Sequence, residues 1–259
     1  MILEIGSINH DYIIHCKQFP RPKESILADQ IETMLGGKGA NQIAAAGRLG
    51  ADAVLIGMLG QDDSANQMIL NDLEWAHVRT ECLETVPDSK TGSAYVIIDQ
   101  SGQNEIIIHA AANAAMTPSI VDKYRSQFEK ATICITEFAL PMETCKYAMK
   151  VAKEYGATTI VNPAPYAEIP EDFYPYIDIL TPNEMEAAQF CGFAVSDPTS
   201  AAAACQWFHQ KGVKNVVITM GHLGAFVSNG AKSLMIDSYH VDAVDTSGGG
   251  DSFNGGLAC

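Results

Sequence analysis

Basic residues are scarce in this chain. Sixteen Lys and Arg stand against 31 Asp and Glu among 259 residues, which gives a formal net charge of −15. A surface of that sign repels nucleic acid and anionic membranes, so we expect neither as a partner. Any phosphate that the protein handles must therefore be held by local groups.

Long apolar runs and paired cysteines are also missing. No run approaches the roughly 20 apolar residues that a bilayer crossing needs, and the first five residues contain Glu4 and no basic segment of a signal peptide. The seven cysteines are odd in number, widely spaced and without a C-x-x-C pair. This pattern indicates neither a zinc site nor a disulfide framework, and it favours reduced, mostly buried thiols. We expect a cytoplasmic protein.

The sequence does contain a regular alternation of apolar, β-branched runs with helical patterns. Such alternation is typical of βαβ units, in which parallel strands form a sheet with helices on both faces. We therefore predict a three-layer α/β/α core with a mostly parallel central sheet. The predicted strands are residues 2–8, 53–59, 131–135, 158–161, 177–180 and 216–219, and the predicted helices are residues 40–49, 64–73, 142–154, 184–190 and 200–211.

Two regions depart from this alternation and have period two instead. Residues 25–34 and 93–110 read as antiparallel strands, and the second region turns at residues 100–103. We predict a small inserted β-sheet, called the lid below, with strands from about 10–36 and 90–112. An ordinary edge hairpin is the alternative, because short period-two segments are ambiguous.

The lid also bears on assembly and on domain organisation. It exposes apolar side chains such as Tyr95, Ile97 and Ile107, and a small sheet with one wet face often buries the other against a second copy. We therefore expect a homodimer through the lid. The chain, residues 1–259, is expected to form a single domain consisting of the core and this lid.

Two glycine-rich segments each precede a predicted helix. Gly36-Gly37-Lys38-Gly39 lies before the helix at 40–49, and Gly248-Gly249-Gly250 lies before a helix that begins near Ser252. Consecutive glycines let the backbone approach a ligand closely, and a helix N-terminus offers free N–H groups to an anion. The first segment is neither a P-loop nor a dinucleotide motif, because Gly39 and Gln42 replace required residues. Alone, it is equally consistent with a flexible loop before a helix.

Asp251 is an acid set inside the second glycine-rich segment. A carboxylate at this place can cap the helix. It can also take a proton from a hydroxyl while backbone N–H groups hold the phosphate that is transferred. A kinase site is therefore the functional hypothesis for this segment, and a helix cap is the structural alternative.

Several motifs follow one another along the chain. They are Gly6-Ser7-Ile8-Asn9-His10-Asp11, Gly36-Gly37-Lys38-Gly39-Ala40-Asn41-Gln42, Asn162-Pro163-Ala164-Pro165, Thr181-Pro182-Asn183-Glu184-Met185-Glu186, and Asp245-Thr246-Ser247-Gly248-Gly249-Gly250-Asp251 followed by Ser252-Phe253-Asn254-Gly255. One such motif would only be suggestive, whereas all of them in order are specific. Their order resembles that of the ribokinase family of carbohydrate and nucleoside kinases, and the resemblance covers the whole chain.

The resemblance implies a role for each matching residue. Asp251 corresponds to the catalytic base, and Gly248, Gly249 and Gly250 correspond to the anion hole around the transferred phosphate. The implied sugar-binding residues are Asn9, Asp11, Gly37, Lys38 and Asn41; those near ATP and Mg²⁺ are Asn183, Glu186, Thr219, Gly221 and Gly224; and half of a monovalent-cation site, for K⁺, comes from Asp245 and the carbonyl of Ser247.

Several of these residues also have a plain structural interpretation. By general preference, Asp11 alone is a turn or capping residue. Asn183 and Glu186 alone indicate an exposed helix start, and the stretch after Thr219 reads as a strand-to-hairpin connection.

Two features depart from the family pattern. Family members usually place a sugar-contacting Glu two residues before the Pro that follows the central strand, but here Ala139 has that place before Pro141 and Glu137 lies two residues earlier. Residues two apart on a strand share a face, so Glu137 either reaches the pocket from a shifted position or the contact is absent.

The sequence also stops at Cys259 in the first turns of a helix. We expect that a C-terminal part of the domain, which in the family covers adenine and completes the cation site, lies beyond it.

The resemblance implies an ATP-dependent carbohydrate kinase that uses Mg²⁺ and K⁺, with ribose and its product ribose 5-phosphate as the first expectation. A kinase for another sugar or for a nucleoside is the second hypothesis. A catalytically inactive sugar-binding module is the third.

Overall fold

The computed structural model describes residues 1–61, 63–241 and 246–259. The strands of its central sheet are β1 (Ile2–Ile5), β4 (Ala53–Gly60), β5 (Val78–Arg79), β6 (Leu83–Val86), β9 (Ile133–Glu137), β10 (Thr158–Asn162), β11 (Ile179–Leu180), β12 (Asn215–Thr219), β13 (Ala225–Ser228) and β14 (Ser233–Ile236). The helices are α1 (Lys38–Arg48), α2 (Asn66–Trp75), α3 (Pro118–Lys123), α4 (Arg125–Phe128), α5 (Met142–Glu154), α6 (Glu184–Cys191), α7 (Pro198–Gln210) and α8 (Gly249–Leu257).

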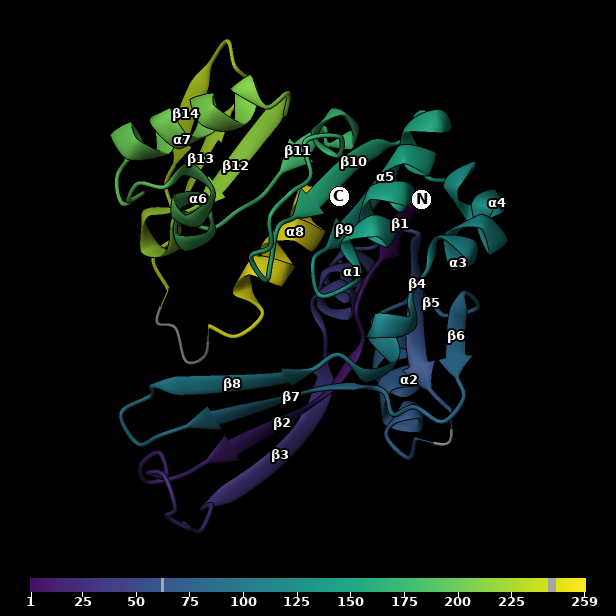
Figure 1. Cartoon of the computed structure of the whole chain (residues 1–259), viewed down its shortest axis with the longest axis vertical. Helices are drawn as coiled ribbons and strands as arrows, with labels where there is room; N and C mark the ends of the chain where they lie inside the picture. The colour runs from purple at the N-terminus through teal and green to yellow at the C-terminus, as the bar shows by residue number, and fades with distance from the viewer. Residues whose placement is uncertain (62, 242–245) are drawn as a thin grey trace.

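The central sheet is mostly parallel, as predicted. Its strand order is β14-β13-β12-β11-β10-β9-β1-β4-β5, with β6 paired to β4. The pairs from β12 through β5 are parallel, whereas β12–β13 and β13–β14 are antiparallel. The carboxyl ends of the parallel strands therefore meet at one edge of the sheet, toward the lid (Figure 1).

Helices cover both faces of this sheet, which confirms the three-layer core. On one face Ile43 of α1 and Leu73 of α2 belong to a core cluster with Leu55 of β4. On the other face Met149 of α5 and Phe208 of α7 belong to a second cluster. Within the described ranges, no helix has the combination of length and hydropathy that a bilayer crossing requires.

The lid is a separate four-stranded sheet with the order β3-β2-β7-β8. Its strands are β2 (Asn9–His15), β3 (Gln30–Gly36), β7 (Gly92–Ile98) and β8 (Asn104–His109). The pairs β2–β3 and β7–β8 are antiparallel as expected, but β2 and β7 are parallel. The two hairpins of the lid are thus joined by a parallel pair, because Asn9 and Gly92 start side by side at the core and both strands run outward from it (Figure 1).

Candidate active site

Asp251 lies in the first turn of α8, because this helix begins at Gly249 and not near Ser252 as predicted. Its side chain is 8% exposed. Asn41 Nδ2 donates to Oδ2 at 3.1 Å, and Gln42 Nε2 donates to Oδ1 at 3.2 Å. Both carboxylate oxygens thus accept from α1, and among the described residues no side-chain capping hydrogen bond is present at the start of α8. The capping interpretation of Asp251 is wrong.

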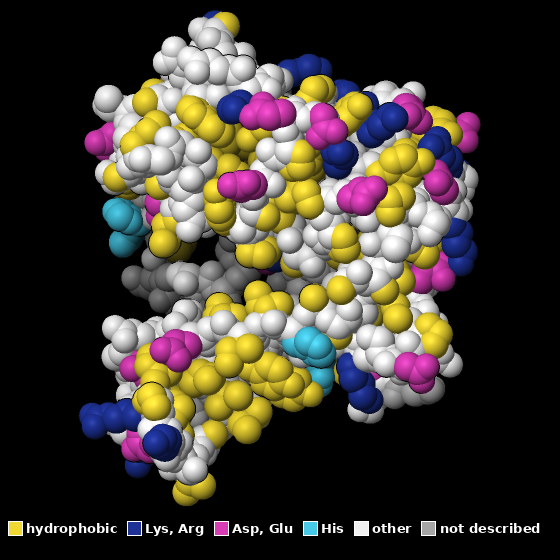
Figure 2. Space-filling model, viewed as in Figure 1, with side chains coloured by type: hydrophobic (Ala, Val, Ile, Leu, Met, Phe, Trp, Pro, Cys, Tyr) yellow, Lys and Arg dark blue, Asp and Glu magenta, His cyan; other side chains and the backbone are white. Residues whose placement is uncertain are grey.

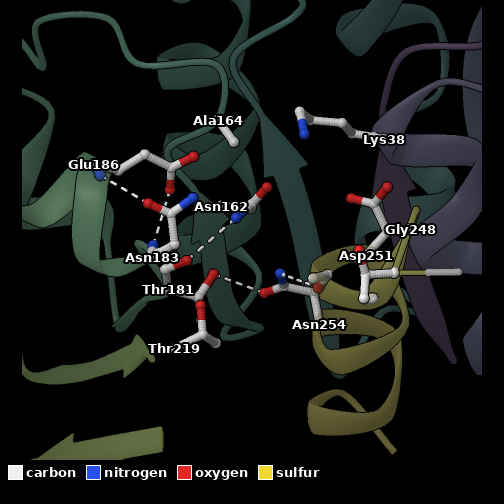
Figure 3. Close-up of a pocket in the computed structure, with 13 residues that line it drawn as sticks. Lys38, Asn162, Ala164, Thr181, Asn183, Glu186, Thr219, Gly248, Asp251 and Asn254 are labelled. Carbon is white, nitrogen blue, oxygen red and sulfur yellow. Dashed lines mark hydrogen bonds between the residues drawn. The ribbon is translucent and has the colours of Figure 1, made fainter. Parts of the chain in front are cut away.

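A cavity of about 210 Å³ opens beside Asp251, at the carboxyl edge of the sheet. Figure 3 shows Asp251 and Lys38 on one side of it and Asn183 and Glu186 on the other. The lining residues are Lys38, Asn162, Ala164, Thr181, Asn183, Glu186, Thr219, Thr246, Gly248, Gly249, Gly250, Asp251 and Asn254. The structure therefore brings the predicted catalytic base, the predicted anion loop and three residues predicted near ATP and Mg²⁺ into one pocket.

The predicted anion hole is the N-terminal end of α8. Gly248, the N-cap, has a φ of 69°, in the left-handed region that favours glycine. A Cβ added at Gly249 or Gly250 would meet no atom within 4 Å, so the space over this helix end is open. An open helix N-terminus beside a lysine suits a phosphate group, because the helix dipole and the backbone N–H groups both favour negative charge.

Asn183 and Glu186 form the opposite wall through a capping box on α6. The Glu186 N–H donates to Asn183 Oδ1 at 2.7 Å, and the Asn183 N–H donates to Glu186 Oε2 at 3.0 Å. Burial raises the pKa of Glu186, while the Asn183 N–H and the positive charge of Lys38 lower it. These residues therefore form a half-buried helix start that lines the pocket, and their role near ATP and Mg²⁺ stays a prediction.

The connection after β12 contributes less to the pocket than predicted. Thr219 lines the pocket and is bridged to Asn183. Gly221 and Gly224 are not among the lining residues. Gly224 has a φ of 103°, and a Cβ there would lie 2.0 Å from the carbonyl oxygen of Ile236, so packing against β14 already requires glycine. A nucleotide-binding role for Gly221 and Gly224 stays a prediction.

On the lid side of Asp251, the structure assembles most of the predicted sugar-binding residues. Asp11 Oδ1 accepts a hydrogen bond from the Ala94 N–H at 3.0 Å, and Gly36 leaves room for this carboxylate, since a Cβ there would lie 1.9 Å from Asp11 Oδ2. Gly37, with a φ of 89°, brings the start of α1 against the backbone of residues 7–9. Lys38 and Asn41 follow on α1.

Asn9 is held by a residue that the sequence analysis missed. The side chain of Asn113, which is 1% exposed, donates to Asn9 Oδ1 and to the Ile8 carbonyl, and it accepts from the Ile8 N–H, each at 3.0 Å. Gly92 is close-packed here, because a Cβ would lie 2.2 Å from Asn113 Nδ2. Nothing in the spacing of the sequence singles out Asn113, whose role depends on contacts more than 100 residues apart.

The structure does not place Glu137 on a pocket wall. This side chain is fully buried; Oε1 accepts from the Ser7 N–H at 2.7 Å and Oε2 from the Ala139 N–H at 2.6 Å. Both oxygens are thus used to fix the ends of β1 and β9. A contact of Glu137 with the sugar stays a prediction.

The predicted metal-binding residues differ in what the structure describes of them. Asp245 lies outside the described residues, and Ser247, though described, does not line the cavity. No group of three His, Cys, Asp or Glu suited to a metal occurs in the described part of the chain. Glu186 and Asn183 nevertheless fit Mg²⁺, which usually binds one or two carboxylates together with phosphate oxygens and water.

The fold and the site together are typical of a small-molecule kinase, because an α/β sheet with a lid carries a helix N-terminus open to phosphate and a buried carboxylate beside it. The chain belongs to the pfkB family of carbohydrate kinases, whose family model matches residues 1–259.

Individual relatives agree with this family. The chain is 38% identical over 258 residues to the bifunctional ribokinase/ribose-5-phosphate isomerase A of Fructilactobacillus sanfranciscensis, and the match covers 99% of this chain and 48% of that protein. It is 35% identical over 253 residues to the ribokinase of Haemophilus influenzae, covering 98% of this chain and 82% of that one. The structure is similar to that of Arabidopsis thaliana ribokinase complexed with ribose and ATP, with a TM-score of 0.92, 28% identity and coverage of 99% and 84%.

Proposed function

We propose that this chain transfers the γ-phosphoryl group of ATP to a primary hydroxyl of a sugar, with ribose as the substrate and ribose 5-phosphate as the product. The observation that carries the proposal is the position of Asp251, held by Asn41 and Gln42 at the open N-terminus of α8. The ribokinases among its relatives support ribose as the sugar. We expect the reaction in the cytoplasm.

The geometry supports a direct transfer. Asp251 accepts the proton of the sugar hydroxyl, and that oxygen forms a bond to the γ-phosphorus while the bond from the γ-phosphorus to the bridging oxygen breaks and ADP leaves. Gly249 and Gly250 present the helix N-terminus to the transferred group, and Lys38 adds a positive charge on the same side of the cavity.

Two cations are part of the proposal. Asn183 and Glu186 would hold Mg²⁺, which neutralises charge on the phosphate oxygens when bound. K⁺ would bind near Asp245 and the carbonyl of Ser247. Activity measured after K⁺ is replaced by Na⁺ tests this second site, and equal rates in the two salts would reject it.

The burial of Glu137 favours a second candidate, a kinase for another sugar or a nucleoside, because Ala139 stands where the family has its sugar-contacting Glu and both oxygens of Glu137 already accept backbone N–H groups. ADP release measured with pentoses, hexoses and nucleosides decides between them. We expect the highest kcat/KM with ribose, and a preference for a nucleoside would reject that substrate.

Calorimetry with ATP tests the third hypothesis, since a folded chain that binds sugar without binding ATP would be a non-catalytic module.

Asp11 makes sugar binding dependent on pH. Burial raises the pKa of Asp11 to about 6, and the negative charge of Asp251 adds to the rise, while the Ala94 N–H and the Asn9 side chain oppose it. Asp11 is therefore ionised above about pH 6 and protonated below it, where it loses acceptor capacity for sugar hydroxyls. We expect the KM for the sugar to rise as the pH falls through about 6.

The matched variant for this prediction is Asp11→Asn. It should have a higher KM throughout and no inflection near the same pH, as measured by initial rates at saturating ATP. An unchanged inflection in Asp11→Asn would assign the pH dependence to another group.

The lid supports a homodimer as the assembly state. Tyr12 stacks on Tyr95 with ring centroids 5.0 Å apart, and Ile107 lies opposite Tyr95 in the register. These side chains share the face of the lid opposite to Asp11, and Tyr95, Ile107 and Ile31 are 39%, 63% and 59% exposed. Figure 2 shows hydrophobic side chains gathered over the lid.

Light scattering at micromolar concentration should therefore give twice the mass of the chain. Ile107→Lys should give a monomer, and Leu234→Lys, on the exposed edge strand β14, should not. A monomeric parent protein, or a dimer that survives Ile107→Lys, would contradict an interface through the lid.

A further inference from the structure

Glu4 is a carboxyl group in the middle of the central sheet. It lies on β1, between Leu55 of β4 and Ile135 of β9 in the strand register. The residue is fully buried, and among the described residues neither carboxyl oxygen has a hydrogen-bond partner. An ionised carboxylate in such a place is very costly, so the side chain keeps its proton.

This carboxyl group lies beneath the start of α1. A Cβ added at Gly6 would be 3.0 Å from Glu4 Oε1 and 2.4 Å from Gly39 Cα, which places the Glu4 carboxyl group and the first turn of α1 together on the same side of Gly6. The same helix carries Asn41 and Gln42, the two donors to Asp251. Glu4 is therefore on the face of the sheet from which the catalytic carboxylate is held.

Three carboxyl groups share this face, and only two of them are compensated within the described structure. Glu137 accepts two backbone N–H groups, and Asp251 accepts two side-chain amides. Glu4 accepts none. Gln42 Oε1 is also buried without a donor, so this layer has an unmet acceptor and a carboxyl group that offers a hydrogen only when it is protonated.

The remaining surroundings of Glu4 favour the same neutral form. Burial raises the pKa of Glu4 well above its ordinary value, and the charges of Glu137 and Asp251 raise it further. The neighbouring strand positions Leu55, Ile135 and Ile160 are apolar. Burial and the charge of Glu4 raise the pKa of the Cys134 and Cys145 thiols. Burial raises the pKa of Glu137 and of Glu186, and the positive charge of Lys38 lowers it.

We propose that Glu4 is a positioning residue that acts through Asp251: while protonated it leaves the catalytic carboxylate and its two amide donors in place, and its ionisation puts an uncompensated anion behind them and slows phosphoryl transfer. The role rests on the proposed function, because it requires Asp251 to be the base. It makes the alkaline limit of turnover a property of a residue that touches neither substrate.

The test compares Glu4→Gln with the parent protein. Glutamine has nearly the same shape and cannot ionise, so the ratio of its kcat to that of the parent should rise by about tenfold as the pH is raised from neutral to the alkaline limit at which the parent stays folded. Its infrared spectrum at neutral pH should lack a band of a buried protonated carboxyl group that the parent shows. Glu74→Gln, an exposed change on α2, should alter neither the kcat ratio nor this band.

Stability gives a further readout. Because the pKa of Glu4 is raised in the folded state, its stabilising contribution is complete below the ordinary value of 4.5 and is lost as the pH rises toward the folded value. Glu4→Gln should therefore unfold at a higher denaturant concentration at neutral pH and depend less on pH.

The outcomes separate cleanly. A kcat ratio that stays constant with pH, with or without a gain in stability, would reduce Glu4 to a structural role and overturn the proposal. Absence of the infrared difference at neutral pH would overturn the neutral form itself. If Asp251 proved not to be the base, the infrared and stability differences would persist, so failure of the proposed function is distinguishable from failure of this inference.

Discussion

Asp251→Asn is expected to lower kcat by about 10²–10⁴, with a much smaller change in sugar affinity. The asparagine side chain cannot accept the hydroxyl proton, and its NH₂ group would face the amide donors of Asn41 or Gln42, where the parent has an acceptor. Steady-state rates with ribose and ATP, together with calorimetric titration of the sugar, measure the two effects separately.

A matched change away from the cavity is Asp72→Asn on α2, which should keep the parent rate. If Asp251→Asn retained a kcat close to that of the parent, Asp251 would not be the base. If it lost sugar binding and thermal stability together, the substitution would have disturbed the α1–α8 contact, and the rate could not be assigned to chemistry.

Gly39→Ala is expected to lower the free energy of unfolding by about 1–3 kcal/mol. A Cβ at this position would lie 2.3 Å from Gly6 Cα and 2.8 Å from the Ser7 nitrogen, and both are backbone atoms that cannot move aside alone. Helix α1 would have to shift away from β1 and take Asn41 and Gln42 with it, so kcat/KM should fall as well. Denaturant unfolding and initial rates measure the two losses.

Gly256→Ala is the matched control, because Gly256 is also a helical glycine. A Cβ there would come no closer than 3.8 Å to its nearest neighbour, Leu49 Cδ1. Alanine should therefore be neutral or stabilise α8 by up to about 1 kcal/mol, since alanine favours a helix interior over glycine. An equal loss of unfolding free energy in the two variants would show that the close approach of Gly39 to Gly6 is not the reason why this position requires glycine.

The sheet and its helices could be predicted because their signals are local. Helix α5, for example, has the predicted bounds of residues 142–154. The stretch after Thr219 did read as a strand-to-hairpin connection, but the bounds of β13 and β14 were not predicted; Leu234 and Ile236 are 63% and 51% exposed, so β14 is not marked by a buried run. The early start of α8 was also missed, because Gly249 and Gly250 disfavour a helix.

The site could be predicted only where a residue type carries its own chemistry. The acid Asp251 and its glycines lie where the motif implies, at the edge of the sheet with Lys38. The roles of Gln42, Asn113 and Glu4 could not be predicted, because the role of an amide or a buried acid depends on the group that faces it in the folded structure. The structural role of Glu137 could not be predicted either, since nothing in the sequence reveals that the Ser7 and Ala139 N–H groups donate to its two oxygens.

Helices α1 and α8 lie side by side although the bond between Asn41 and Asp251 spans 210 positions of the chain (Figure 1). During synthesis the ribosome therefore delivers both strand pairs of the lid and every described strand of the sheet before it delivers Asp251. The lid-side residues Asn9 and Asp11 can reach their folded positions while Asn41 and Gln42 still lack the carboxylate that they hold. The contact between α1 and α8 is thus among the latest to form within the described residues, although α1 is among the first elements made.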